Sequence, residues 1–191
     1  MVLSLPNVLT LLRIALIPIV IIAFFHDSPF NRWLAAIVFF LACLTDFFDG
    51  YLARLWAQTS RVGQLLDPIA DKLLVISTLF LLASFGRIQG ITFIPAVIII
   101  WREILVSGLR EFTSHYNLTL EVSNMAKWKT SVQMLALGIL LLGDVAPFGH
   151  ALVLLGSVLL WIAALLTTIT GIYYGRKAWQ AAIDDKEKDY E

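Results

Sequence analysis

The chain alternates between long apolar stretches and short polar breaks. A helix needs about 20 mostly apolar residues to cross a membrane, and six of the stretches approach that length. Polar and turn-forming residues separate them, as at residues 26–29 and 86–90. The pattern predicts an all-α membrane protein with six transmembrane helices, in a single domain over residues 1–191. The expected spans are residues 8–25, 33–56, 63–85, 91–112, 125–142 and 149–174.

Composition supports this interpretation. Hydrophobic residues make up 59% of the chain and charged residues 15%, whereas soluble domains have about a quarter charged residues. This balance excludes a disordered chain, and a single cysteine, Cys43, excludes a disulfide scaffold. The formal net charge is zero, so overall charge does not suggest a nucleic-acid partner. Gly138, Gly143 and Gly156 are expected to mark close helix packing.

The distribution of Lys and Arg predicts the orientation in the membrane. Six spans place both termini on one side, which we expect to be the cytoplasmic side of the cell (plasma or inner) membrane. The first stretch lacks a basic leading region, so we interpret it as a span and not a removable signal, with residues 5–7 as a lead-in at the membrane surface. The cytoplasmic side would hold Arg54, Arg61, Arg110, Lys127, Lys129, Arg176, Lys177, Lys186 and Lys188, and the opposite loops Arg32 and Arg87.

Four aspartates lie within the second and third expected spans, all near their cytoplasmic ends: Asp46, Asp49, Asp67 and Asp71. A central Asp raises the insertion free energy by roughly 2.5–3.5 kcal/mol, so four are tolerable only in a polar, neutralised environment. At 100° per residue, Asp46 and Asp49 lie about 60° apart and Asp67 and Asp71 about 40° apart. Each pair therefore shares one helix face, and we expect a polar cavity that faces the cytoplasm.

Small residues accompany the acids, since Gly50 and Ala53 share the face of Asp46 and Gly63 that of Asp67. Carboxylate ligands without clustered His or Cys favour a hard cation such as Mg²⁺ or Mn²⁺. The alternative is that the acids cap helices or pair with nearby basic residues. Four acids on matched faces favour the metal site.

Carboxylate-bound metal ions with nearby arginines suit phosphoryl transfer, because two cations can clamp phosphate oxygens while a carboxylate accepts the proton of the attacking hydroxyl. A divalent-cation transporter is an alternative of another class. Transport sites lie near the bilayer midplane, whereas these acids lie near one face. This counts against transport.

The acids also form a sequence signature. Residues 46–71 match D-x-x-D-G-x-x-A-R-x8-G-x3-D-x3-D without a gap. This resembles the signature of the CDP-alcohol phosphatidyltransferases, which move a phosphatidyl or related group from a CDP-linked donor to an alcohol and release CMP. The resemblance implies a two-metal site, with Asp46, Asp49 and Asp67 on the first ion and Asp67 and Asp71 on the second, Asp46 being shared.

The same resemblance assigns further roles. Asp71 would be the general base. A member that only binds or acts as a scaffold is an alternative that the intact signature disfavours, and a homodimer is possible on family grounds. The CDP part of the donor would be held by Gly50, Ala53, Arg54, Ser60 and Gly63.

Segments outside the signature resemble one branch of the family, which uses glycerol 3-phosphate as acceptor and CDP-diacylglycerol as donor. These are Leu5–Arg13, Arg102-Glu103-Ile104, Leu109-Arg110-Glu111, Val122-Ser123 and Lys127–Thr130. Glycerol 3-phosphate is a dianion that needs a basic pocket, which Arg110, Lys127 and Lys129 could supply. Alternatively, Arg110 pairs with Glu103 or Glu111 and the lysines are membrane anchors. Inositol phosphate, serine and phosphatidylglycerol remain alternative acceptors.

Overall fold

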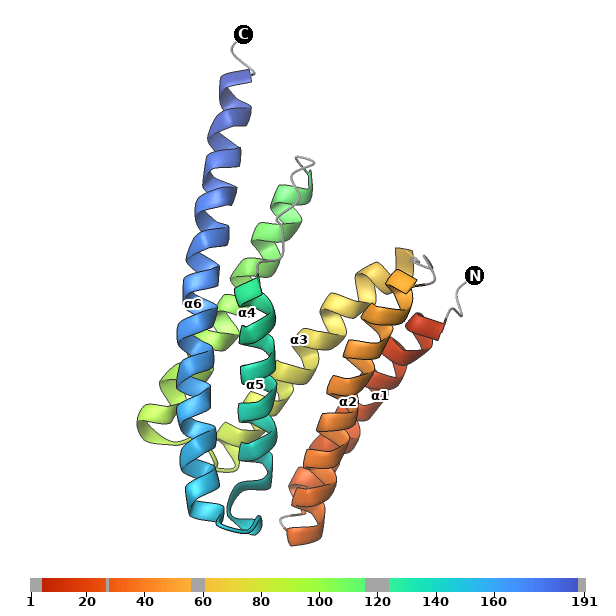
Figure 1. The fold of residues 1–191 in the computed structure, drawn as a ribbon, viewed down its shortest axis with the longest axis vertical. Coiled ribbons are helices and arrows are strands. Elements are labelled where there is room, and N and C mark those ends of the chain that lie inside the picture. The colour runs from red at the N-terminus through yellow and green to blue at the C-terminus, as the bar shows by residue number, and fades with distance from the viewer. Residues whose placement is uncertain (1–4, 27, 56–60, 116–123, 189–191) are drawn as a thin grey trace. The chain divides into compact units, whose positions relative to one another are not determined.

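The computed structural model describes residues 5–26, 28–55, 61–115 and 124–188 (Figure 1). Within these ranges the regular elements are all helices, which confirms the all-α prediction. The short 3-10 helices η1 (Gly90–Thr92) and η2 (Gly143–Val145) lie in connections. The α-helices are α1 (Leu5–Phe25), α2 (Pro29–Leu55), α3 (Arg61–Ser84), α4 (Phe93–His115), α5 (Asn124–Leu142) and α6 (Gly149–Lys188).

Local signals explain where helices begin and end. Ser28 caps α2, because its hydroxyl oxygen accepts a hydrogen bond from the backbone N–H of Asn31 at 3.2 Å. α3 ends at a turn in which Gly86 has a φ of 69°. There the N–H of Arg87 donates to the carbonyl of Leu82 at 2.8 Å, which satisfies a carbonyl at the helix end.

The first helix begins earlier than the sequence pattern predicts. Residues 5–7, expected as a lead-in, are already helical, because α1 begins at Leu5 and Asn7 is buried within it. The stretch apolar enough to cross a membrane begins at Asn7, one residue before the expected start. Pro6 is compatible with this start, since N–H groups in the first turn have no partner within the helix. The helix thus carries the polar side chain of Asn7 into the packed interior.

Apolar surface identifies an integral membrane protein. Large apolar side chains are widely exposed, for example Ile22 at 64% and Trp101 at 67%, and such a surface requires lipid to cover it. Among the described residues, α3 and α5 contain no stretch that is both long enough and apolar enough to cross a membrane. In α3, charged residues occupy positions 67, 71 and 72. The described stretches long and apolar enough to cross a membrane are Asn7–Phe25, Pro29–Asp46, Gly90–Thr113 and Gly149–Gln180.

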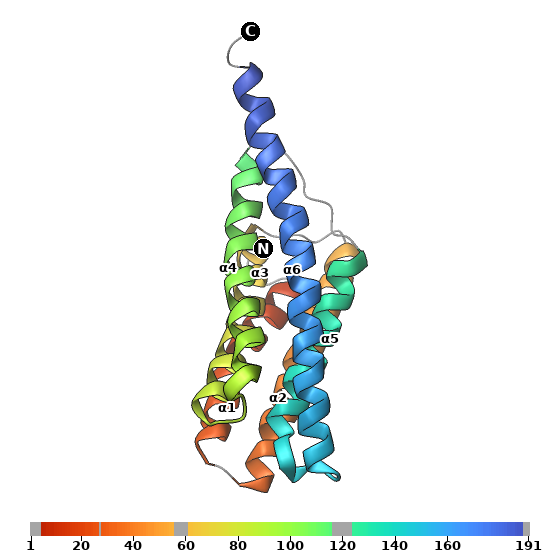
Figure 2. The same cartoon turned by 90° about the vertical axis from the view of Figure 1, so that its left-hand side faces the viewer.

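The chain forms two compact units. The first contains residues 1–89 and 134–157, and the second contains residues 90–133 and 158–191. In the first unit, α1 packs along both α2 and α3. In the second unit, α4 and α6 lie side by side (Figure 2). Contacts of residues 102 and 110 with residues 170 and 174, respectively, show that these two helices run in the same direction.

Close packing is confirmed at Gly156, where α6 meets α5 in the first unit. A Cβ at Gly156 would lie 2.9 Å from Cγ of Leu140 and 3.1 Å from Cγ2 of Ile139, so only glycine fits without a shift. Gly143 has a different role from the one predicted. Its φ of 61° places it in the turn after α5, where the left-handed conformation favours glycine.

Two arginines converge on one carboxylate in the connections of the first unit. Arg32 and Arg87 both donate to Oδ1 of Asp144, the latter at 3.0 Å. The cluster joins the start of α2, the end of α3 and the turn after α5. The hydrogen bond from Arg32, with a further one from Arg87, lowers the pKa of Asp144 below its ordinary value of 3.8.

This pKa direction predicts a pH-dependent contribution to stability. Since the folded-state pKa is depressed, the stabilisation is present above pH 3.8 and is lost as the pH falls through the lower folded value. Asp144 is 59% exposed, so solvent screening limits the effect to about 1 kcal/mol or less. Thermal unfolding in detergent should show Asp144→Asn less stable than wild type at pH 7, with a difference that shrinks as the pH falls below 3.8. A difference that stays constant with pH would contradict this account.

Candidate functional site

Asp46, the first acid of the signature, is held by a residue of α1. The guanidinium of Arg13 lies 2.7 Å from Oδ1 of Asp46. The Arg13 side chain is 0% exposed and that of Asp46 is 40% exposed. An enclosed cation requires an anionic partner, and Asp46 provides it. The sequence pattern suggested basic residues of α2 and α3 as partners for the aspartates. In the structure, the partner of Asp46 is Arg13, from α1.

Asp67, on α3, is held by the same helix. The hydroxyl of Thr10 donates a hydrogen bond to Oδ1 of Asp67 at 2.5 Å. Thr10 is 0% exposed. Thr10 and Arg13 are three residues apart, which places them on the same face of α1. One turn of α1 therefore contacts an acid on α2 and an acid on α3.

Sequence reasoning did not single out this face of α1 as part of the site. Asn7, Thr10 and Arg13 are all buried in a helix that is otherwise almost entirely apolar. The signal was available: three polar residues at a spacing of three form one stripe on a helix. We call these three residues the α1 polar stripe.

Asp71 lies one turn after Asp67 on α3. Its residue is half-buried, and its Oδ1 atom is shielded from solvent. The thiol of Cys43, one turn before Asp46 on α2, interacts electrostatically with both Asp46 and Asp71. Asp71 thus lies on the side of α3 that faces this part of α2.

The remaining predicted donor and metal residues are only partly described. Gly63 is buried in α3. Ser60 lies outside the described residues, and so do the side chains of Asp49, Gly50, Ala53 and Arg54, whose backbone belongs to α2. Among the side chains that the structure describes, no three acidic, histidine or cysteine groups form a complete metal site. The four-carboxylate cluster stays a prediction.

The described donor set nevertheless fits a hard divalent cation. Asp46, Asp67 and Asp71 offer oxygen ligands only, which Mg²⁺ and Mn²⁺ prefer. Thr10 and Arg13 of α1 contact Oδ1 of Asp67 and Oδ1 of Asp46, and each carboxylate has a second oxygen, Oδ2. Hydrogen bonding of ligating carboxylates by outer groups is usual in metal sites.

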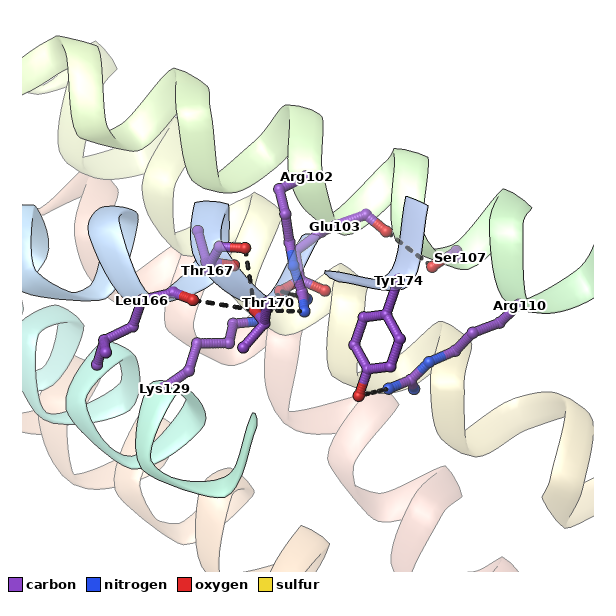
Figure 3. Close-up of polar contacts among 9 residues, drawn as sticks. All are labelled: Arg102, Glu103, Ser107, Arg110, Lys129, Leu166, Thr167, Thr170 and Tyr174. Carbon is purple, nitrogen blue, oxygen red and sulfur yellow. Dashed lines mark hydrogen bonds and ion pairs between the residues drawn. The ribbon is translucent and has the colours of Figure 1, made fainter. Parts of the chain in front are cut away.

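A second cluster of charges lies in the second unit, where Glu103 of α4 contacts two basic groups (Figure 3). Nη1 of Arg102 lies 3.2 Å from Oε1 of Glu103, and Nζ of Lys129 donates to the same oxygen. Nη2 of Arg102 also donates to the hydroxyl of Thr170 on α6 at 3.2 Å. Two cations share one carboxylate, so the group keeps a net positive charge. We call Arg102, Glu103 and Lys129 the Glu103 cluster.

Arg110 lies two turns further along α4 than Arg102. Its Nη2 donates to the hydroxyl of Tyr174 at 3.4 Å, and its guanidinium carbon lies 5.1 Å from the ring centroid (Figure 3). Arg110 itself is exposed, whereas Tyr174 is fully buried. A buried aromatic ring therefore orients an accessible cation. The hydroxyl of Ser107 donates to the carbonyl of Glu103 within α4 at 2.7 Å.

The predicted basic residues differ in how the structure places them. Lys129 is buried against Glu103, the acid that the alternative interpretation had paired with Arg110. Arg110 instead stacks on Tyr174. The side chain of Lys127 lies outside the described residues. Sequence analysis did not list Arg102 among the site residues, although its position beside Glu103 is the available signal.

Three buried polar atoms of the second unit have no hydrogen-bond partner among the described residues. They are Nε of Arg102 on α4, Oε1 of Gln133 on α5 and Oγ1 of Thr167 on α6. Such atoms are rare in proteins and call for water or a ligand. All three helices of the second unit thus offer polar atoms to an additional polar group.

A family model described as CDP-alcohol phosphatidyltransferase matches residues 3–169. The chain belongs to the CDP-alcohol phosphatidyltransferase family. The matched range contains the complete signature, the α1 polar stripe and the Glu103 cluster. CDP-alcohol phosphatidyltransferases use a divalent metal ion, in agreement with the oxygen ligands of α2 and α3.

Individual relatives cover nearly the whole chain. A Rickettsia bellii protein named CDP-diacylglycerol–glycerol-3-phosphate 3-phosphatidyltransferase is 48% identical over 171 residues, which cover 90% of this chain and 93% of the relative. A protein with the same name from Cereibacter sphaeroides is 40% identical over 218 residues, covering 96% and 99%. Another from Haemophilus influenzae is 40% identical over 184 residues, covering 95% and 97%. The names of these three relatives all give glycerol 3-phosphate as the acceptor.

Proposed function

We propose that the protein transfers a phosphatidyl group from CDP-diacylglycerol to glycerol 3-phosphate, giving phosphatidylglycerol phosphate and CMP. The observation that carries this proposal is identity of 40–48% with relatives of that name over at least nine tenths of the chain. The intact signature from Asp46 to Asp71 supports a catalytic member of the family. The protein would thus be a phosphatidylglycerophosphate synthase.

The reaction would be a direct displacement. The acceptor hydroxyl attacks the β-phosphorus that carries diacylglycerol, the bond between this phosphorus and the bridging oxygen breaks, and CMP leaves with that oxygen. Asp71 would accept the hydroxyl proton as general base. A carboxylate on a helix, half-buried and next to a second acid one turn away, suits this role because its position is fixed and its surroundings are polar.

The metal ligands would be Asp46, Asp49, Asp67 and Asp71. When bound, Mg²⁺ or Mn²⁺ would neutralise the pyrophosphate of the donor and the charge that develops on the leaving CMP. Around these acids, Gly50, Ala53, Arg54, Ser60 and Gly63 would hold the CDP part of the donor. Small side chains allow a nucleotide to approach the helix backbone, and an arginine suits a phosphate oxygen.

The acceptor phosphate would bind to Arg110, Lys127 and Lys129, and we add Arg102 to this group. Arg110 supports the assignment because it is exposed and held by Tyr174. Arg102 and Lys129 support it because two positive charges contact the single carboxylate of Glu103. The buried polar atoms without protein partners on α4, α5 and α6 are consistent with a hydroxylated, charged acceptor.

The topology completes the proposal. We propose six spans with both termini in the cytoplasm and a polar cavity open to that side of the cell membrane, as the distribution of Lys and Arg indicates. The diacylglycerol tails would stay in the bilayer while the CDP group enters the cavity. A homodimer is proposed on family grounds.

Acceptor specificity is the test of this function. Purified protein in detergent is supplied with Mg²⁺ and CDP-diacylglycerol, and CMP release is measured with glycerol 3-phosphate, serine, inositol phosphate or phosphatidylglycerol. We expect release with glycerol 3-phosphate alone. Release with another acceptor instead would keep the transfer chemistry and overturn the acceptor. No release from folded protein with any acceptor would overturn the enzymatic function.

Replacement of Arg110 by alanine tests the acceptor site. We expect the KM for glycerol 3-phosphate to rise about tenfold, because a hydrogen bond to a charged group contributes about 1.5–3 kcal/mol, while the KM for CDP-diacylglycerol changes little. Arg176→Ala is the matched control, since Arg176 is exposed on α6 two residues from Tyr174 and hence on another face. Equal increases in both KM values would return Arg110 to a structural role.

A further inference from the structure

The α1 polar stripe makes two contacts that the proposed chemistry does not yet use. Thr10 donates to Oδ1 of Asp67, and Arg13 pairs with Oδ1 of Asp46. Both residues are 0% exposed, so neither is a surface group that meets an acid by chance. Buried polar side chains in a membrane helix are unfavourable unless they have a structural or functional partner.

The position of α1 gives these contacts their importance. In the first unit, α1 packs along α2 and α3, whereas the described parts of α2 and α3 contact each other over a shorter stretch. The position of the α2 acids relative to the α3 acids therefore depends mainly on how both helices pack against α1. Thr10 and Arg13, one turn apart, fix one carboxylate on each of these two helices.

Each contact also leaves the carboxylate able to act as a ligand. Thr10 and Arg13 both contact an Oδ1 atom, and the Asp46 side chain is 40% exposed. A carboxylate held through one oxygen has a defined rotamer and presents its other oxygen in a defined direction. This is the arrangement by which outer groups orient metal ligands.

We propose that Thr10 and Arg13 are positioning residues that hold Asp67 and Asp46 in the orientation required to bind a divalent cation. This inference rests on the proposed function, which assigns the two acids as metal ligands. Neither residue is a ligand itself. Their effect is on the affinity for the cation, which is measurable without turnover.

Thr10 provides the cleaner test. Thr10→Val removes the hydroxyl while keeping the shape and the net charge, so electrostatic attraction of the cation is unchanged. Loss of an outer partner typically lowers metal affinity by 10–100-fold. Thr10→Ser keeps the donor and should stay within about threefold of wild type by the same argument.

Thr78→Val is the matched control. Thr78 lies on α3 in the same unit, is 1% exposed, and donates its hydroxyl to the carbonyl of Leu74 at 2.7 Å. The variant therefore removes a similarly buried hydroxyl that does not contact an acid. It should change the melting temperature without changing the response to Mg²⁺.

The experiment titrates MgCl₂ against the purified full-length protein in detergent and follows thermal unfolding, because a ligand of the folded state raises Tm in proportion to ln(1 + [L]/Kd). We expect the Mg²⁺ concentration at which Tm begins to rise to be 10–100-fold higher for Thr10→Val than for wild type. For Thr10→Ser and Thr78→Val, Tm should begin to rise at about the same Mg²⁺ concentration as for wild type, even where the starting Tm differs. Thr10→Ala replaces the valine variant if that variant does not fold.

Arg13→Lys gives an independent result. Lysine keeps the charge but lacks the planar fork of arginine. If Arg13 orients Asp46, the lysine variant should need more Mg²⁺ than wild type; if Arg13 supplies only charge, the two curves should coincide.

The outcomes separate this inference from the proposed function. A wild-type protein that responds to Mg²⁺, together with a Thr10→Val variant that responds at the same concentration, would overturn the positioning role alone. So would a Thr10→Val variant with a lower Tm and an unchanged Mg²⁺ midpoint. A wild-type protein that neither responds to Mg²⁺ nor releases CMP would overturn the metal site and, with it, this inference.

Discussion

Replacing Asp71 with asparagine should lower the rate of CMP release by about 10²- to 10⁴-fold, the usual contribution of a general base. Asparagine has nearly the same shape as aspartate and preserves the local packing of α3. It cannot accept the proton of the acceptor hydroxyl. Binding of CDP-diacylglycerol should persist, because other residues are proposed to hold the donor.

The measurement compares CMP release at saturating Mg²⁺ with donor binding, followed as the rise in Tm on adding CDP-diacylglycerol. Asp144→Asn is the matched control, since Asp144 lies in a connection of the same unit and its carboxylate pairs with Arg32 and Arg87. Near-normal turnover by Asp71→Asn would remove Asp71 as the base. Joint loss of turnover and donor binding would restrict its role to the metal site.

Replacing Glu103 with glutamine should lower the free energy of unfolding by about 3–5 kcal/mol, the usual effect of removing one partner from a buried ion pair. The side chains of Glu103, Arg102 and Lys129 are 13%, 11% and 6% exposed. Glutamine keeps the size of glutamate but leaves two largely buried cations without their shared anion. The cost therefore comes from uncompensated charge.

A double-mutant comparison tests this origin. Lys129→Met removes one cation while keeping a long apolar side chain, so Glu103→Gln/Lys129→Met should recover part of the lost Tm in detergent. Recovery would show that the two residues are energetically coupled. If the decreases in Tm of the two single variants instead add up in the double variant, the effect of Glu103→Gln does not come from the ion pair with Lys129.

Sequence patterns predicted the positions of the helices and the residues that share one helix face, because both depend only on spacing along a single helix. Apolar runs placed the helices, and the intervals between Asp46 and Asp49 and between Asp67 and Asp71 placed each pair on one face, because helical rotation per residue is constant. The helix α1 begins three residues before the expected span, since Pro6 and Asn7 resemble a loop although both are acceptable in a first turn.

Contacts between helices were not predictable in the same way. The contact between Lys129 and Glu103 was not predicted, because the packing of α5 on α4 determines which charges meet. Thr10 and Arg13 were visible as polar residues in an apolar helix. Their partners depend on how α1 packs against α2 and α3, which no spacing within α1 encodes.

The length of α6 has a consequence for how the protein fits its membrane. Its apolar stretch, Gly149–Gln180, has 32 residues, or about 48 Å of helix, whereas the hydrocarbon core of a bilayer is about 30 Å thick. This mismatch is too large for a helix tilt of up to about 40° to absorb. Part of α6 must therefore extend past the lipid tails, and Trp179, which is exposed, suits the headgroup region. Thr170 and Tyr174, which contact Arg102 and Arg110, lie on this helix. A change in the thickness of the surrounding bilayer is therefore expected to affect the two arginines that we propose bind the acceptor.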